Sequence, residues 1–350
     1  MSKNKKIVGL LVASMLAFAA CTPAAPAPTP PAPAPAPAAG APADAPADAV
    51  TEPTVDFPTR AINMTVAFGA GGGTDLAARA FQAVAPEFFN GQSFVVNNVT
   101  GGGGATWYSQ GHLQNADGYE VTIATVEIVT LPLLQDVPFA TEDYTYIAKM
   151  NFPAAAISVH SDSPWYTLED FLEAAAARPG EIRVGNSGVN GIWDLHTHAL
   201  AQAAGVTFNH IPYEGAAPAV VALMAGEIEA VAVSAAEVST QVLDGTFRLL
   251  SVAAAERLPS FPDVPTHGEF GLEVPFIGGW RGLAVPANTP PEIVAEFERR
   301  ATEVINSQEF IDIMTQQDLT VNFLNSADFT AYVREQQEFF SVMIEELGLR

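Results

Sequence analysis

The chain has 350 residues, with 15 Lys and Arg against 39 Asp and Glu, a formal net charge of −24, 49% hydrophobic residues and one cysteine. Such an acidic protein lacks the basic face that nucleic-acid binding needs, and one cysteine excludes an intramolecular disulfide, a cysteine-rich zinc site and an iron–sulfur cluster. Length and apolar content predict a folded protein of about two lobes.

The N-terminus carries an export signal. Residues 1–20 begin with lysines, continue in an apolar run and end in small residues, and this run is shorter than a membrane span of roughly 20 residues. In LAFAAC, Cys21 stands where a bacterial lipoprotein carries its lipid, although Phe18 replaces the usual leucine, so ordinary cleavage after Ala19 stays open. We therefore expect an extracytoplasmic protein that is lipid-anchored to the cell membrane through Cys21, either in the periplasm or on the outer face of the cytoplasmic membrane.

A tether follows the signal. Residues 21–57 consist mainly of Ala and Pro, a composition that cannot bury apolar surface, so we expect a disordered, extended spacer. We expect the folded part to divide into lobe 1, residues 58–155 and 274–350, and lobe 2, residues 156–273.

The folded part alternates apolar strands and helical segments with glycines at the joins, which is typical of α/β architecture. In chain order, the pattern predicts strands at 62–68, 94–97, 119–125, 155–160, 182–185, 209–212, 228–233, 247–253 and 283–286. It predicts helices at 74–88, after 104, from the capping box of Thr167 and Asp170 to 177, at 193–204, at 217–225, after Pro290, near Ser307 and near Ala327.

Three glycine-bearing loops follow strands, at residues 69–73, 101–104 and 186–188. Glycine lets the backbone approach a ligand, and the N-terminus of the next helix favours an anion without any lysine. These loops lack the lysine of a P-loop and the last glycine of GxGxxG, so we expect no nucleotide cofactor. A ligand between two such lobes would meet two helix N-termini, although the glycines alone are also compatible with simple turns.

Catalytic and metal patterns are weak. Ser187 in GNSGV lacks the final glycine of a nucleophile elbow, and His196 and His198 are two residues apart on an expected helix and face different sides. Asp194 suits the start of that helix. We therefore expect neither enzyme activity nor a metal site.

Six segments in order carry a family resemblance: FGAGGGTDLAAR, NNVTGGGGAT, ADGYEVTIAT, VGNSGVNG, HIPYEGAAPAVVALMAGEIEA and PDVPTHGEFG. Their order and spacing resemble the extracytoplasmic solute-binding proteins of tripartite tricarboxylate transporters, the Bug family, from about Ile62 to the C-terminus. The resemblance implies a two-lobed type II periplasmic-binding-protein-like fold with a ligand cleft between the lobes. It also implies that the cleft closes on a small organic acid, held largely by glycine loops and water with few charged side chains.

The resemblance implies ligand contacts in both lobes. Transferred to this sequence, the predicted ligand-binding residues are Phe68, Ala70, Gly71, Gly72, Thr74, Asp75, Gly102, Gly103, Thr125, Ser187, Gly188 and Tyr213. Asp75 either contacts the ligand or braces its own loop from the first turn of its helix, and Tyr213 is either an aromatic wall of the cleft or a core residue.

Three departures from the family pattern change charge and stiffness near the cleft and so bear on the ligand. Gly69-Ala70 stands where the family usually has a proline before the glycine pair, NNVT replaces the usual Glu-Asn-Arg-Pro, and Glu214 replaces a common lysine. Asp75 and Glu127 would accept an ammonium group if they face the ligand, which would favour an amino acid over a tricarboxylate.

We predict a monomeric receptor that hinges near residues 152–156 and 274–280 and delivers its ligand to the membrane subunits of a transporter. A binding protein that reports to a sensor kinase is the alternative, followed by a secreted hydrolase that uses Ser187 or the histidines.

Overall fold

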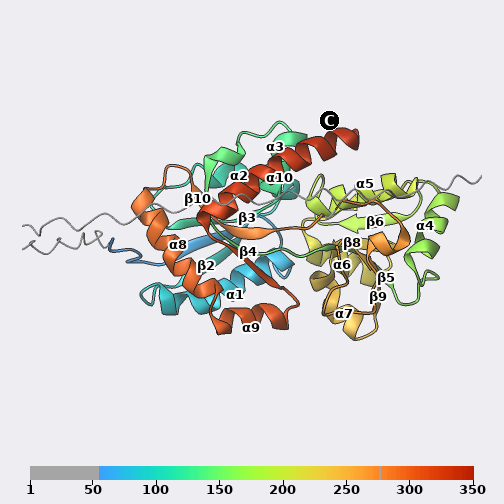
Figure 1. Ribbon diagram of the computed structural model, residues 1–350, viewed down its shortest axis with the longest axis horizontal. Coiled ribbons are helices and arrows are strands. Elements are labelled where there is room, and N and C mark those ends of the chain that lie inside the picture. Colours follow the sequence, from blue (N-terminus) through green and yellow to red (C-terminus); the bar gives the residue numbers. More distant parts are fainter. Residues whose placement is uncertain (1–54, 276) are drawn as a thin grey trace, which may run out of the picture. The chain divides into compact units, whose positions relative to one another are not determined.

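The computed structural model describes residues 55–275 and 277–350, so the predicted signal peptide, Cys21 and most of the predicted tether lie outside the described residues. The fold is mixed α/β, with a six-stranded and a five-stranded sheet and helices around both (Figure 1). Within the described ranges, every helix is too short or too polar to cross a bilayer.

The six-stranded sheet has the order β11-β4-β10-β3-β1-β2. Strand β1 pairs parallel with the edge strand β2 and with β3, whereas β10 pairs antiparallel with β3 and β4. Its strands are β1 (Ile62–Val66), β2 (Phe94–Asn98), β3 (Glu120–Thr125), β4 (Tyr144–Asn151), β10 (Arg281–Pro286) and β11 (Val321–Leu324). The helices in these parts of the chain are α1 (Gly73–Phe88), α2 (Ala105–Gly111), α3 (Glu127–Leu134), α8 (Pro291–Ile305), α9 (Gln308–Gln316) and α10 (Ser326–Glu346).

The five-stranded sheet has the order β7-β6-β8-β5-β9. Its strands are β5 (Ala155–His160), β6 (Arg183–Asn186), β7 (Asn209–Pro212), β8 (Ala230–Ser234) and β9 (Phe247–Val252). The α-helices between them are α4 (Leu168–Ala177), α5 (Ile192–Ala204), α6 (Ala216–Met224) and α7 (Ser239–Leu243). Short 3₁₀ helices occupy Gly102–Gly104, Thr141–Asp143, Ala235–Val238 and His267–Phe270.

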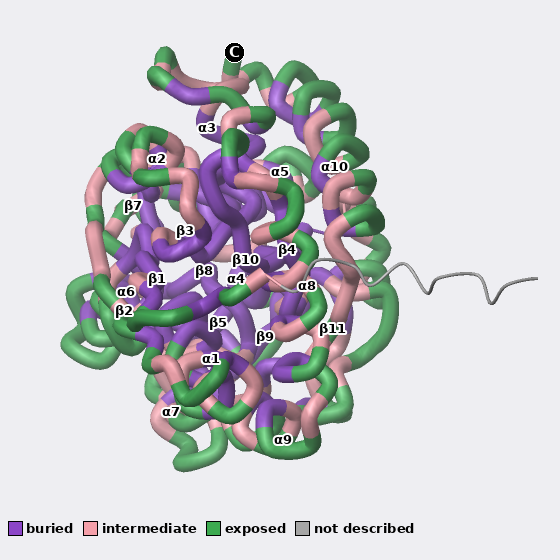
Figure 2. The backbone as a smooth tube through the Cα atoms, turned by 90° about the vertical axis from the view of Figure 1, so that its left-hand side faces the viewer, coloured by how far each residue is buried: buried purple, intermediate pink, exposed green. Residues whose placement is uncertain are grey.

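Both faces of β8 are buried, which explains its continuous apolar sequence. Because side chains alternate along a strand, Val231 and Val233 join the core cluster that extends through the six-stranded sheet, whereas Ala230 and Ala232 join a second cluster with Phe171 of α4. Figure 2 shows mostly buried residues in the central strands and exposed residues on the outer turns of α9 and α10.

The predicted strands and helices are present with small shifts at their ends, and the capping box of Thr167 and Asp170 is formed. The sequence reading missed α3, α7, β4 and β11. Strand β4 lacks a clear apolar pattern because it contains Lys149, which is only 4% exposed. The Lys149 ammonium lies 4.2 Å from the ring centroid of Tyr332, and burial lowers its pKa to about 8.

The chain passes between the two sheets at two neighbouring segments. Residues 152–154 join β4 to β5, and Ala154 forms an antiparallel bridge with Gly278 on the return path. Gly279 N donates to Pro153 O at 3.1 Å, and a Cβ on Gly278 would lie 2.7 Å from the same oxygen. These segments coincide with the predicted hinge. Motion about this hinge, and the division of the chain into two lobes, stay predictions.

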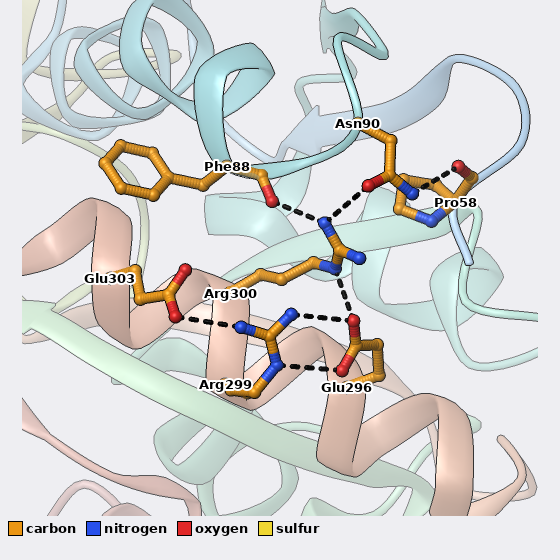
Figure 3. A network of polar contacts seen from close by, with 7 residues as sticks. All are labelled: Pro58, Phe88, Asn90, Glu296, Arg299, Arg300 and Glu303. Carbon is orange, nitrogen blue, oxygen red and sulfur yellow. Dashed lines mark hydrogen bonds and ion pairs between the residues drawn. The ribbon is translucent and has the colours of Figure 1, made fainter. Parts of the chain in front are cut away.

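A network around Arg300 fastens helix α8 to the beginning of the described chain (Figure 3). Arg300 donates to Phe88 O, Asn90 Oδ1 and Glu296 Oε1, and Asn90 Nδ2 donates to Pro58 O at 3.3 Å. The preceding Phe57, which we assigned to the tether, is buried with its ring centroid 5.1 Å from that of Tyr119. Ordered packing therefore includes the last residue of the predicted tether.

Two histidines form a buried pair beside the five-stranded sheet. His196 Nε2 and His267 Nε2 lie 2.8 Å apart, and both side chains are buried. Such a pair needs one donor and one acceptor nitrogen, so at least one of the two rings must be neutral. Burial lowers the pKa of His267 to about 4, and burial together with the charge of His267 lowers the pKa of His196 well below its usual value.

We expect this histidine pair to make the free energy of unfolding depend on pH at values higher than those at which most carboxylates titrate. Because the pKa of His267 is depressed in the folded state, its contribution is complete above pH ~6.5 and is lost as the pH falls toward 4. Between pH 7.5 and 5 the free energy of unfolding measured in urea should fall by about 2 kcal/mol from His267 alone. His267→Gln should flatten this pH dependence, and an unchanged slope would contradict the assignment.

Candidate functional site

A cavity of about 30 Å³ lies where the two sheets meet. It has room for about two water molecules, so a larger ligand requires the surrounding elements to separate. The residues that line it come from both sheets and their following helices: Phe68, Gly72, Gly73, Thr74, Thr125, Glu127, Ser187, Ile192, Trp193, Ala216, Glu237, Gly279 and Arg281. They include the N-terminal residues of α1 and α5, as the glycine loops predicted.

Each of these two helix N-termini is capped by a glutamate from the other sheet. Neither Gly72 nor Gly191, the N-cap residues of α1 and α5, offers a side chain for capping. Instead, Gly73 N at the start of α1 donates to Glu237 Oε1 at 3.1 Å, and Ile192 N at the start of α5 donates to Glu127 Oε1 at 3.0 Å. A carboxylate is favourable at such a position because of the exposed N–H groups and the helix dipole.

Arg281, the first residue of β10, is the cation of the cavity, and its side chain is 3% exposed. Its Nη2 lies 3.2 Å from Glu237 Oε1 and its Nε donates to Thr74 Oγ1 at 3.0 Å, whereas Nη1 has no hydrogen-bond partner among the described residues. Burial lowers the pKa of Arg281, and the charges of Glu237 and Glu127 oppose this effect. A buried guanidinium with one unpaired nitrogen is a donor available to an anion.

Glu127 is the second carboxylate of the cavity and is 2% exposed. Its Oε2 accepts a very short hydrogen bond from Thr125 Oγ1, and its other oxygen caps α5. Burial raises the pKa of the Glu127 carboxyl, against the opposing effects of these hydrogen bonds and of the Arg281 charge. Within the described residues no cation lies within salt-bridge distance of Glu127, so the carboxylate retains acceptor capacity.

Five predicted ligand-binding residues line the cavity, namely Phe68, Gly72, Thr74, Thr125 and Ser187. The other seven do not line it, and Ala70, Gly71 and Gly102 are exposed. Ligand contact by any of the twelve therefore remains a prediction, with the geometry favouring the first five.

The carboxylate of Asp75 is used within its own loop. Its Oδ2 accepts hydrogen bonds from Gly71 N at 2.9 Å and Arg79 Nε at 2.8 Å, and its Oδ1 accepts one from Asn98 Nδ2 at 3.0 Å. Burial acts to raise the pKa of Asp75, but these three hydrogen bonds lower it by more. The geometry thus corresponds to the bracing alternative.

The second and third glycine loops contact each other directly. A Cβ on Gly103, which has a φ of +65°, would lie 2.8 Å from Val189 O, and one on Gly188 would lie 2.9 Å from the Cα of Gly103. Glycine is therefore required here for the two backbones to approach.

Tyr213 packs at the edge of the core cluster, and its N–H donates to Asn186 O at 3.0 Å.

Sequence reasoning missed Arg281 and Glu237, which line the cavity together with Glu127. That few charged side chains contact the ligand stays a prediction. Arg281 left one signal, a lone charge immediately before the apolar strand sequence GLAVP. Glu237 also completes a capping box with Ser234, so its sequence pattern indicates only a local cap and conceals the contacts with α1 and Arg281.

One group of described residues has the composition of a metal site, because Asp194, His198 and His210 offer ligand atoms within 4.8 Å of one another. The His198 and His210 rings are stacked, with centroids 4.0 Å apart and an interplanar angle of 20°. A metal would have to lie in both ring planes about 2 Å from each nitrogen, which stacked rings do not permit. Asp194 instead accepts from Asn190 N and His210 Nδ1, as expected for a residue that supports the start of α5.

An α/β fold with a cavity where two sheets meet is the arrangement of periplasmic solute-binding proteins. Residues 78–349 match the family described as tripartite tricarboxylate transporter family receptor. The chain belongs to this family, whose members are extracytoplasmic solute-binding receptors rather than enzymes.

Solved structures agree with the family. A TctC solute-binding protein from Polaromonas, without ligand, is 36% identical and covers 83% of this chain and 99% of its own, with a TM-score of 0.62. The periplasmic binding protein BugD is 26% identical over 84% of this chain and 99% of its own, with a TM-score of 0.80. Rpa4515 of R. palustris, solved with adipate, has the same identity, coverage and TM-score.

Because Asp75 braces its own loop, its substitution should lower the stability of the fold and leave the cavity unchanged. In Asp75→Asn, an amide replaces the carboxylate that accepts from Gly71, Arg79 and Asn98, and the free energy of unfolding in urea should fall by about 2 kcal/mol. Asp136→Asn, at an exposed position, should change it by less than about 0.5 kcal/mol. Equal effects of both variants would show that the brace contributes little.

Proposed function

We propose that this receptor binds a small carboxylate-bearing solute in the cavity and delivers it to the membrane subunits of a tripartite transporter, acting as a monomer and turning over no substrate. The observation that carries this proposal is the buried Arg281, whose Nη1 is unpaired at a cavity bordered by two helix N-termini. The adipate-bound R. palustris protein supports the carboxylate class.

We further propose that the described structure corresponds to a closed state of two lobes that move about the paired segments near Ala154 and Gly278. The small cavity supports closure, since about 30 Å³ admits no organic acid of several carbons. The comparisons are in keeping with it. The ligand-free Polaromonas protein is more similar in sequence than the adipate complex but superposes less well, as expected if the lobes differ in relative position.

Thermal unfolding of the full chain with mono-, di- and tricarboxylates and amino acids tests the ligand class. At a hundredfold excess over Kd, a ligand should stabilise the protein by about 2.7 kcal/mol, and small-angle scattering should report compaction. Arg281→Met should weaken binding by about 10- to 100-fold through loss of a charge-assisted hydrogen bond. Arg60→Met, which removes an exposed ion pair with Asp117, is the control. No stabilisation by any acid would overturn the proposal.

The site does not distinguish a transporter from a sensor, but deletion of the protein does. Loss of uptake of the identified ligand supports delivery to a transporter. Loss of induction with uptake intact would instead support the sensor-kinase alternative.

We also propose that Cys21 carries a lipid and that the Ala- and Pro-rich segment after it is the tether to the membrane. The sequence LAFAAC supports this proposal. Cys21→Ser should transfer the protein from the membrane fraction to the soluble extracytoplasmic fraction and remove the mass of the lipid. Recovery of the unaltered chain in the soluble fraction would contradict the proposal.

A further inference from the structure

The third glycine loop continues to the start of α5, and one buried carboxylate holds this loop, residues 186–191. Asp194 lies in the first turn of α5 and is buried, and its Oδ1 accepts from Asn186 Nδ2 at 3.0 Å. The side-chain oxygen of Asn186 in turn accepts from Gly188 N at 3.0 Å. Ser187, between these two residues, lines the cavity. The position of Asp194 therefore determines the position of a loop that borders the cavity.

The same carboxylate has two further donors, and one of them is a histidine. Asn190 N donates to Asp194 Oδ2 at 3.0 Å, and His210 Nδ1 of β7 donates to Asp194 Oδ1 at 2.6 Å. A second histidine, His198, lies one turn after Asp194 on α5, and its ring stacks on that of His210. All of these groups belong to the five-stranded sheet and its helices. Their contacts therefore do not depend on how close the two sheets lie to each other.

The two stacked rings face a single carboxylate, which can balance one positive charge but not two. A second proton would place two like charges in rings whose centroids are 4.0 Å apart. Burial, together with the charge of His210, lowers the pKa of His198, and the charge of Asp194 opposes this effect. Because this pKa is depressed in the folded state, the stacked arrangement is complete above pH ~6.5 and is lost as the pH falls.

The other charged or titratable groups on the surrounding described elements have partners of their own. On β6, which lies beside the edge strand β7, Arg183 is paired with Glu229. On α5, His196 is paired with His267. Strand β8, against which α5 also packs, carries no titratable side chain. Protonation of the stacked pair therefore acts on Asp194 and, through Asp194, on the loop.

We propose that Asp194 and His210 are positioning residues for ligand binding, which hold loop 186–191 in its binding conformation at neutral pH and loosen it when His198 and His210 are both protonated. This inference rests on the proposed function and concerns the regulation of the same site, whatever the class of the ligand. Such a receptor binds its ligand more weakly as the medium around the cell becomes acidic.

Amide hydrogen exchange of the full chain without ligand tests this inference. After correction for the intrinsic effect of pH on exchange, the protection of the Gly188 and Asn190 amides should fall at least about threefold between pH 7.5 and pH 5. The amides of β8 are the reference within the same sheet, and their protection should fall by less. An equal fall in β8 would show that the whole sheet loosens, and constant protection in the loop would show that the histidines do not act on it. Either result would overturn the inference.

Two substitutions of His210 separate its hydrogen bond from its charge. His210→Leu removes the donor to Asp194 and should lower the protection of the loop amides about tenfold at pH 7.5, as expected for a lost charge-assisted hydrogen bond. His210→Gln keeps a donor, so it should retain most of the protection and lose the pH dependence. Asp194→Asn should resemble His210→Leu. If His210→Gln and His210→Leu behave alike, the ring only fills space and the positioning role is wrong.

The stacking partner is tested separately. His198→Gln should leave the protection at pH 7.5 unchanged and reduce the effect of acid pH to less than about twofold. His160→Gln is the matched control, because the side chains of His160 and His198 are both 34% exposed and His160 lies outside the cluster. It should keep the wild-type pH profile. A wild-type profile in His198→Gln as well would contradict the proposed effect of double protonation.

Calorimetry with succinate, glutarate, citrate and glutamate relates the loop to binding. For each acid that binds, the loss of affinity between pH 7.5 and pH 5 should be at least about threefold smaller in His198→Gln than in the wild type. The comparison of two proteins cancels the titration of the acid itself. Equal losses would overturn the effect on binding and leave the receptor intact. If none of the four acids binds, the receptor proposal loses support, whereas the exchange measurements still decide whether the cluster positions the loop.

Discussion

The burial of the Arg281 guanidinium is the constraint on which the site depends. A guanidinium that loses its water must be paired, and here its partners come from both sides of the cavity, since Thr74 lies in the first turn of α1 and Glu237 follows β8 of the other sheet. The same Glu237 oxygen caps α1, so one ion pair determines the position of a strand, a helix start and the opposite sheet. The cap of α5 by Glu127 repeats this arrangement in the other direction. At the cavity the two sheets therefore contact each other through directional hydrogen bonds and an ion pair. Such contacts favour one relative position of the two sheets.

This arrangement relates the fold to ligand capture. Glycines at positions 103 and 188 allow the loops to meet backbone to backbone, and the paired segments at Ala154 and Gly278 keep the two chain crossings together. If the sheets separate, both glutamate caps and the Arg281 pair break, and water takes their place. A solute that contacts both sides of the cavity would then supply part of the free energy of closure.

Much of the architecture could be predicted from the sequence, because local signals there agree with the final structure. The glycine loops, the capping box of Thr167 and Asp170, and the alternation of strands and helices all depend on neighbouring residues. Glu127 was a candidate from the sequence, but its place in one cavity with Arg281 could not be predicted. The two residues are about 150 positions apart in the chain and are brought together only by the pairing of β10 with β3. Glu237 was obscured for a different reason, namely that a local capping role explains its position completely. Strand β4 was missed because the buried Lys149 breaks its apolar pattern.

Lys149 also gives the protein a chemical property that has nothing to do with its ligand. No other lysine occurs after residue 6, and this one is shielded within β4 under the ring of Tyr332. With its pKa lowered to about 8, roughly a tenth of the amine is in the unprotonated, reactive form at pH 7, far more than for an ordinary lysine. Burial within β4 still limits the access of an amine-directed reagent. The folded part of the chain contains a single internal reporter of transient opening, readable as one change in mass.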